Sequence, residues 1–150
     1  MNTDKLREQL ATDEGIVNEI YLDHLGYPTF GIGHLITDHD PEKGQEVGTS
    51  ISEERVNQAF DEDVQTVVAD CAICFNTWDG YPEEAKQVFA NMMFNMGRTR
   101  LSKFKKMIAA VNDSNWEEAA AQMEDSRWYK QTTNRATRLI NRIIIIGVPA

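Results

Sequence analysis

The sequence predicts an α+β fold, in which a small N-terminal lobe with an antiparallel sheet is joined by a long helix to an all-helical C-terminal lobe. Two observations favour this class. Residues 16–36 are rich in strand-forming side chains and glycine, whereas the chain after residue 51 shows apolar side chains at helical spacing. A chain of 150 residues, 41% hydrophobic and 26% charged, can bury a core and has an ordinary globular composition.

The first helix is expected over residues 3–14. Two leucines lie one turn apart on its apolar face, and Gly15 stands where a glycine commonly ends a helix. Glu14 would then lie at the negative end of the helix dipole, which disfavours a further negative charge. This position therefore favours the protonated carboxyl that a general acid needs.

Residues 16–36 are predicted to form the small antiparallel sheet, because aromatic and β-branched residues there are interrupted by three glycines. The polar segment 37–50 is predicted to be a loop. Its Asp-His-Asp cluster at residues 38–40 has the side chains of a metal site, but the spacing matches no standard ligand motif. We therefore predict no metal and no cofactor.

A long helix is expected over residues 52–75, where Ser52 can cap its start and an apolar stripe follows. Because such a helix often connects two lobes, one lobe is expected at about residues 14–51. The other is expected at about 76–150, together with the N-terminal helix, within one domain of 1–150. Its helices are predicted to begin at Pro82, Ser102 and Thr133, with a short turn from Ser126, and to end at Gly97 and Gly147. A further helix is predicted from Trp116 to about Glu124, with Ser114 as its cap.

Charged residues are unevenly distributed along the chain. Residues 1–75 contain 4 basic residues (Lys and Arg) and 16 acidic residues (Asp and Glu). Residues 76–150 contain 11 basic and 8 acidic residues, and the net charge of the chain is −9. Nucleic acid is a poor candidate partner for such a chain. The run Lys103, Lys105 and Lys106 is either a solvated helix face or a patch that faces an anionic surface.

No apolar stretch approaches the ~20 residues that a membrane-spanning helix needs. The N-terminus shows no positively charged segment followed by an apolar core, so no signal peptide is expected. The protein is expected to be made and folded in the cytoplasm, without stable membrane association and with a monomer as the default state. If its substrate lies outside, another protein must release it.

One glycine-rich run carries candidate chemistry. Glu14 is followed nine residues later by Asp23 and six residues after that by Thr29. Glycoside hydrolysis needs one carboxylic acid to protonate the leaving oxygen and a second carboxylate to stabilise the oxocarbenium-like state or activate water. The run supplies both, with a hydroxyl that can orient the water. Each residue alone also fits a purely structural role: Glu14 as a surface carboxylate, Asp23 as a turn residue and Thr29 as a strand residue.

The chain resembles the phage-type lysozymes, the muramidases of glycoside hydrolase family 24. The resemblance covers about residues 4–143 and rests on three segments in the same order. Residues 13–34 contain Asp-Glu-Gly, Tyr-x-Asp and Gly-Tyr-x-Thr-x-Gly-Ile-Gly-His; residues 91–97 read Asn-Met-x-Phe-Asn-Met-Gly. Residues 126–136 read Ser-Arg-Trp-Tyr-x-Gln-Thr-x-Asn-Arg-Ala. Three segments with matching spacing are far more specific than an isolated Glu, Asp and Thr.

The resemblance implies a lysozyme-like fold and hydrolysis of the β-1,4 bond between N-acetylmuramic acid and N-acetylglucosamine in peptidoglycan, by inversion. It implies Glu14 as the general acid, Asp23 as the second carboxylate and Thr29 as the holder of the attacking water. Arg135 would pair with the acid across a cleft. The residues implied to contact the glycan are Gly33, Leu35, Phe94, Asn95, Gln122 and Arg135.

Two further positions bear on the resemblance. Asn95 stands where the family usually has a glutamine, so its side chain is one methylene shorter. His34 and Asp63 match a structural His–Asp pair of the family. The implied biological role is host-cell lysis by a free endolysin that reaches the wall with the help of a holin. The competing readings are a lytic transglycosylase, a non-catalytic peptidoglycan-binding protein with a lysozyme fold, and a tail-associated lysozyme.

Overall fold

An antiparallel sheet and a set of helices occupy separate stretches of the chain, which confirms the predicted α+β class. The computed structural model describes residues 1–149. These residues divide into two units. The sheet unit comprises Thr3–Thr66, and the helical unit comprises Met1–Asn2 and the chain from Val67 onward.

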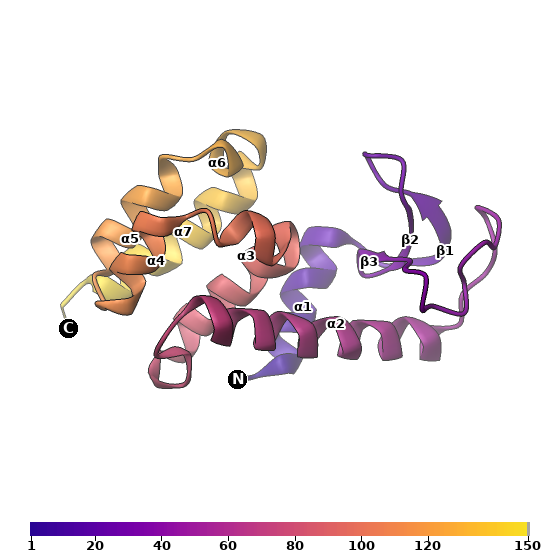
Figure 1. Cartoon of the computed structure of the whole chain (residues 1–150), viewed down its shortest axis with the longest axis horizontal. Coiled ribbons are helices and arrows are strands. Elements are labelled where there is room, and N and C mark those ends of the chain that lie inside the picture. Colours follow the sequence, from indigo (N-terminus) through magenta and orange to yellow (C-terminus); the bar gives the residue numbers. More distant parts are fainter. Residues whose placement is uncertain (150) are drawn as a thin grey trace. The chain divides into compact units, whose positions relative to one another are not determined.

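The sheet unit begins with α1 and continues into three short strands (Figure 1). Leu6 and Leu10 of α1 are fully buried. Gly15 has a φ of +77° and donates its N–H to the carbonyl of Ala11 at 2.9 Å, so the helix ends as predicted. The elements of this unit are α1 (Thr3–Glu14), β1 (Val17–Leu22), β2 (Pro28–Gly31), β3 (His34–Leu35) and the first part of α2 (Glu53–Cys74).

The three strands pair in the order β1-β2-β3, and both pairings are antiparallel. Ile20 of β1 and Phe30 of β2 are completely buried and form part of the core. Gly31, at the end of β2, lies against α2, because a Cβ there would come within 3.1 Å of Val56 Cγ1. The small residue therefore lets the sheet backbone approach the helix.

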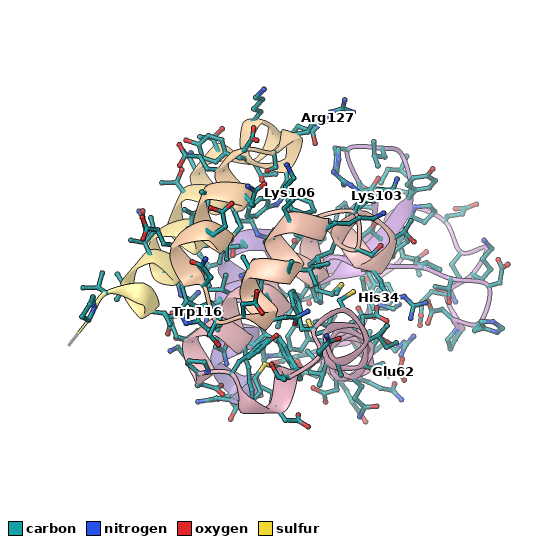
Figure 2. All side chains as sticks on the ribbon, turned by 60° about the vertical axis from the view of Figure 1, so that its left-hand side comes forward. His34, Glu62, Lys103, Lys106, Trp116 and Arg127 are labelled. Atoms are coloured by element: carbon teal, nitrogen blue, oxygen red, sulfur yellow. The ribbon has the colours of Figure 1, made fainter. Side chains whose placement is uncertain are left out.

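A network of charged side chains connects the loop after β3 to α2. His34, at its centre, is labelled in Figure 2. His34 Nδ1 lies 2.7 Å from Asp63 Oδ2, and its Nε2 lies 2.9 Å from Asp40 Oδ2. Arg55 donates hydrogen bonds to Asp40 Oδ1 at 3.1 Å and to both carboxylate oxygens of Glu42. The implied His34–Asp63 pair is confirmed, and the contact of His34 with Asp40 extends it to the loop after β3.

Within the described residues, the helical unit contains the end of α2, a 3-10 helix η1 (Trp78–Gly80) and five further α-helices (Figure 1). Helix α5 contacts both α4 and α7, and α7 also contacts α3 and α6. Phe75, Phe89 and Met92 are fully buried in its core. The five helices are α3 (Glu83–Leu101), α4 (Lys105–Asn112), α5 (Trp116–Glu124), α6 (Arg127–Gln131) and α7 (Thr133–Gly147).

One predicted helix start and one predicted N-cap are wrong, whereas the predicted helix from Trp116 to about Glu124 is confirmed. Ser102 does not open a helix, because it is the C-cap of α3, and α4 begins at Lys105. Ser114 has a φ of +54°, a left-handed conformation that an N-cap does not adopt. The cap of α5 is instead Asn115, whose side chain accepts a hydrogen bond from the Glu118 N–H at 3.2 Å.

Two predicted boundaries are shifted by a few residues. Gly97 interrupts α3 with a φ of 80° and a ψ of 165°, but the chain resumes helical structure and continues to Leu101. Thr132, not Thr133, is the N-cap of α7, and it makes no side-chain capping hydrogen bond. Among the described residues, none of the helices has the length and apolar content that crossing a bilayer requires.

Candidate active site

Glu14 is the last residue of α1, and the left-handed turn at Gly15 directs the chain into β1. Its carboxylate lies against the backbone of Gly33, which has a φ of +61° between β2 and β3. A Cβ at Gly33 would lie 3.0 Å from Glu14 Oε2, so any larger residue would displace the carboxylate. The sequence predicts Gly33 as a glycan contact, and the structure places it beside the predicted acid.

Asp23 follows the last residue of β1 and shapes the turn toward β2. Its Oδ1 accepts hydrogen bonds from the backbone N–H groups of Leu25 and Tyr27, each at 2.9 Å. No hydrogen bond to Asp23 Oδ2 occurs within residues 1–149. One oxygen therefore holds the turn, as the structural reading of this residue expects, and the other is available to a water or substrate.

Thr29 lies in β2 and is 4% exposed. Its hydroxyl donates to the carbonyl oxygen of Tyr27 at 2.9 Å. A threonine hydroxyl has one hydrogen and two lone pairs, so this bond leaves only acceptor capacity. Thr29 can therefore hold a water by accepting a hydrogen from it. The lone pairs of the water oxygen then point away from Thr29.

Tyr21, for which the sequence predicts no role, lies in the same sheet as Thr29. It pairs directly with Thr29 across β1 and β2, an arrangement that puts both side chains on one face of the sheet. Burial raises the pKa of Tyr21 above 10.0, and the negative charges of Glu14 and Asp23 raise it further. The charges of both carboxylates thus act on the Tyr21 phenol, and its strand partner is the residue that carries the hydroxyl.

Tyr21 could have been found from strand periodicity. It lies two residues before Asp23, and alternate residues of an extended chain face the same side. Leu35 also belongs to this group, because it pairs with Thr29 from β3 and is 49% exposed. The sheet unit therefore contains all three predicted catalytic residues and two of the predicted glycan contacts.

The other four predicted contact residues belong to the helical unit. Asn95 Oδ1 accepts a hydrogen bond from Trp128 Nε1 at 2.8 Å, which leaves the amide hydrogens of Asn95 for other partners. Arg135 Nε donates to Asn91 Oδ1 at 2.9 Å. Gln122 Nε2 donates to Glu118 Oε1 one turn earlier in α5, at 2.8 Å. Phe94, in α3, is half-buried.

Comparison with known proteins shows which family the chain belongs to. The Phage lysozyme family matches residues 11–143. The chain is 29% identical over 155 residues to the probable T4-type lysozyme 2 of Dictyostelium discoideum, and the match covers 91% of each chain. It is 31% identical over 160 residues to the pre-baseplate central spike protein Gp5 of Enterobacteria phage T4, covering 95% of this chain and 28% of that protein.

A further relative is the peptidoglycan hydrolase gp36 of Pseudomonas phage phiKMV, 31% identical over 138 residues. That match covers 91% of this chain but 15% of the phiKMV protein. The chain thus spans less than a third of the length of these two phage relatives and nearly all of the Dictyostelium lysozyme. Because the family match covers most of the chain and includes the segment from Glu14 to Thr29, the chain belongs to the phage lysozyme family.

Proposed function

We propose that the protein is an N-acetylmuramidase, which hydrolyses the β-1,4 bond between N-acetylmuramic acid and N-acetylglucosamine in peptidoglycan. The observation that carries the proposal is the grouping around Tyr21, whose environment includes Glu14 and Asp23 and whose strand partner is Thr29. Membership of the phage lysozyme family and the name of the phiKMV relative, a peptidoglycan hydrolase, support the same substrate.

The proposed reaction has one displacement step. The Glu14 carboxyl donates its proton to the glycosidic oxygen while the bond from that oxygen to the anomeric carbon breaks. A water attacks the anomeric carbon from the opposite face and gives up a proton to Asp23. Exchange with solvent returns a proton to Glu14 and removes the one on Asp23, so the net change is the addition of one water.

The contacts in the sheet unit support these separate roles. Asp23 uses Oδ1 to hold its turn, so Oδ2 is the oxygen proposed to accept the proton. Thr29 has its hydrogen committed to Tyr27, so it is proposed to accept a hydrogen from the water. Together they would hold the water with a lone pair aimed at the anomeric carbon, which is the geometry of inversion.

The proposal is tested by the release of reducing sugar ends from purified peptidoglycan by the wild type, Glu14→Gln and Glu8→Gln. Glu8 is an exposed carboxylate of the same helix and serves as the matched control. We expect Glu14→Gln to lower the rate by about 10²- to 10⁴-fold, because a general acid contributes that much. Glu8→Gln should retain the wild-type rate, and circular dichroism should show both variants folded.

Equal rates for Glu14→Gln and the wild type would overturn the assignment of the acid. Mass spectrometry of the fragments separates hydrolysis from transglycosylation, because a transglycosylase leaves an anhydro sugar end. Fragments that all carry that end would replace the hydrolase with a lytic transglycosylase. Glycan binding without any fragment would replace it with a non-catalytic binding protein.

We also propose that the activity serves lysis of a phage-infected cell, with the protein acting as a monomer and without a cofactor. Turbidity of Gram-negative cells with a permeabilised outer membrane should fall with the wild type. The same cells should stay turbid with Glu14→Gln. Clearing by both proteins would show that the lysis does not depend on the glycosidase.

A further inference from the structure

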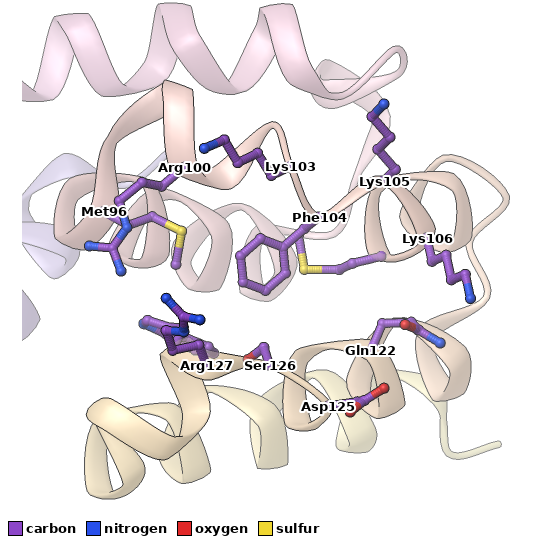
Figure 3. A pocket seen from close by; sticks show the side chains of 12 residues that line it. Met96, Arg100, Lys103, Phe104, Lys105, Lys106, Gln122, Asp125, Ser126 and Arg127 are labelled. Atoms are coloured by element: carbon purple, nitrogen blue, oxygen red, sulfur yellow. The ribbon is translucent and has the colours of Figure 1, made fainter.

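A cavity of about 570 Å³ lies entirely within the helical unit, and five of the twelve residues that line it are cations (Figure 3). Its basic residues come from three parts of the chain: Arg100 from α3, Lys103, Lys105 and Lys106 from the segment that enters α4, and Arg127 from α6. Asp125 is the one acidic residue in its lining. The lysine run therefore borders a pocket, and its three lysines are also exposed to solvent.

The side chains surround an apolar centre. Figure 3 shows the Phe104 ring between two walls, with Arg100 and Arg127 reaching toward the same end from opposite sides. Lys106 lies toward the other end, on the side of Gln122 and Asp125. Figure 2 shows Lys103, Lys106 and Arg127 on the same side of the helical unit. The five cations are all exposed at the rim of the pocket, where a bound anion can reach them from solvent.

These cations have no partners that neutralise them. Within residues 1–149, none of the five forms an ion pair with a carboxylate, although other arginines of the chain do. Like charges in one pocket repel, and they destabilise the fold unless an opposite charge is bound. The chain as a whole has a net charge of −9, so the pocket is not a sample of a generally basic surface.

We propose that this pocket binds a phosphate-bearing polyanion. Arginine presents planar donors that match phosphate oxygens, and lysine supplies a point charge, so the mixture suits phosphates along a flexible chain. The spread of cations over three elements favours several linked charges rather than one ion. The inference rests on the proposed function only for its natural source, which would be a phosphate-bearing polymer of the bacterial envelope.

Binding is tested on the full chain by titration with tripolyphosphate, followed through backbone amide NMR signals. The test variant is Lys103→Gln/Lys106→Gln. The matched control is Lys86→Gln/Lys130→Gln, which removes two lysines of the same unit that do not line the pocket. Citrate serves as a compact carboxylate anion, and poly(glycerol phosphate) serves as a model of an envelope polymer.

We expect tripolyphosphate to shift the amide signals of Lys103, Phe104 and Arg127 with a saturable profile. The test variant should raise the Kd by roughly tenfold or more, the control should change it by less than about twofold, and added salt should weaken binding. Citrate should bind much more weakly. Displacement of tripolyphosphate by poly(glycerol phosphate) assigns the envelope polymer as the source, and its failure to compete assigns a free polyphosphate.

The proposal is overturned if no saturable shift occurs, if citrate binds as tightly, or if both double variants weaken binding equally. The glycosidase is measured separately, by reducing-end release from phosphate-free peptidoglycan. The test variant should keep the wild-type rate there. A protein that binds tripolyphosphate but releases no sugar ends would refute the proposed function and leave the pocket assignment standing.

Discussion

At the scale of single residues, Asp23 combines a structural and a proposed chemical role in its two oxygens. Oδ1 holds the turn through two backbone N–H groups, and Oδ2 makes no hydrogen bond within the described chain. Substitutions that separate these roles exist, because an asparagine side chain retains one carbonyl oxygen as an acceptor but cannot take up a proton.

Asp23→Asn should therefore keep the turn and lose the chemistry. We expect its hydrolysis rate to fall at least about 100-fold while its free energy of unfolding stays within about 0.5 kcal/mol of the wild type. Asp23→Ala should lose activity and also destabilise the protein by about 1 kcal/mol, because both turn hydrogen bonds disappear. Urea unfolding and reducing-end release measure the two effects. Full activity in Asp23→Asn would leave Asp23 a turn residue only.

At the scale of elements, His34 couples β3 to both the following loop and α2. Burial alone would lower the pKa of His34, but hydrogen bonds and negative charge from Asp63 and Asp40 outweigh burial and raise it above 6.5. Burial likewise would raise the pKa of Asp40, but hydrogen bonds from Thr37 and His34 lower it below 3.8. The charged forms of both groups therefore stabilise the folded state.

The sign of the pH dependence follows from these shifts. The His34 contribution is complete below pH 6.5 and is lost as the pH rises through its higher folded-state pKa. The Asp40 contribution is present above pH 3.8 and is lost as the pH falls through its lower folded-state pKa. We expect the urea midpoint to be higher at about pH 6 than at about pH 9, and His34→Gln to lose most of this difference. The same slope in His34→Gln would assign it to other groups.

Helix α3 has its own element-scale feature at Gly97. Its φ of 80° with a ψ of 165° belongs to a region that is essentially restricted to glycine. Gly97→Ala should destabilise the protein by about 1–3 kcal/mol even though no atom lies within 4 Å of the added Cβ. Gly80→Ala is the matched control, since that site is equally open and has no left-handed φ. Similar unfolding midpoints for the two variants would count against backbone strain at Gly97.

The sequence predicts elements well where the signal is local. Gly15 ends α1, and glycines break the strands, because the backbone conformations needed there are ones that other residues rarely adopt. It misplaces the cap of α5, because Ser114 and Asn115 are both capping residue types and only the Asn115 side chain accepts a hydrogen bond from the Glu118 N–H. The role of Tyr21 depends on strand pairing, which the local sequence does not show. The lysine run was indicated as a possible patch, but its grouping with Arg100 and Arg127 depends on tertiary structure.

At the scale of the whole molecule, the first half of the chain is strongly acidic, whereas the second half has a small excess of basic residues. Residues 1–75, which include the candidate catalytic group, have 12 more acidic than basic residues, whereas five of the 11 cations of residues 76–150 line one pocket. An anionic glycan surface is therefore repelled by the acidic part of the chain over a distance set by salt.

Hydrolysis of phosphate-free peptidoglycan should accordingly become faster as salt is first added. The Debye length falls from about 30 Å at 0.01 M to about 10 Å at 0.1 M, which screens the repulsion. Initial rates across a sodium chloride series measure the effect, and sucrose at equal osmolality controls for changes other than screening. Rates that only decrease from the lowest salt onward would exclude long-range repulsion as a factor.

The proton NMR signal of the sugar anomer released first from a soluble peptidoglycan fragment tests the central claim most directly. The roles proposed for Glu14, Asp23 and Thr29 require attack from the face opposite the leaving group, so the α-anomer should accumulate before mutarotation. Glu14→Gln should release no sugar over the same period. The β-anomer as first product, or an anhydro sugar without a reducing end, would contradict the account.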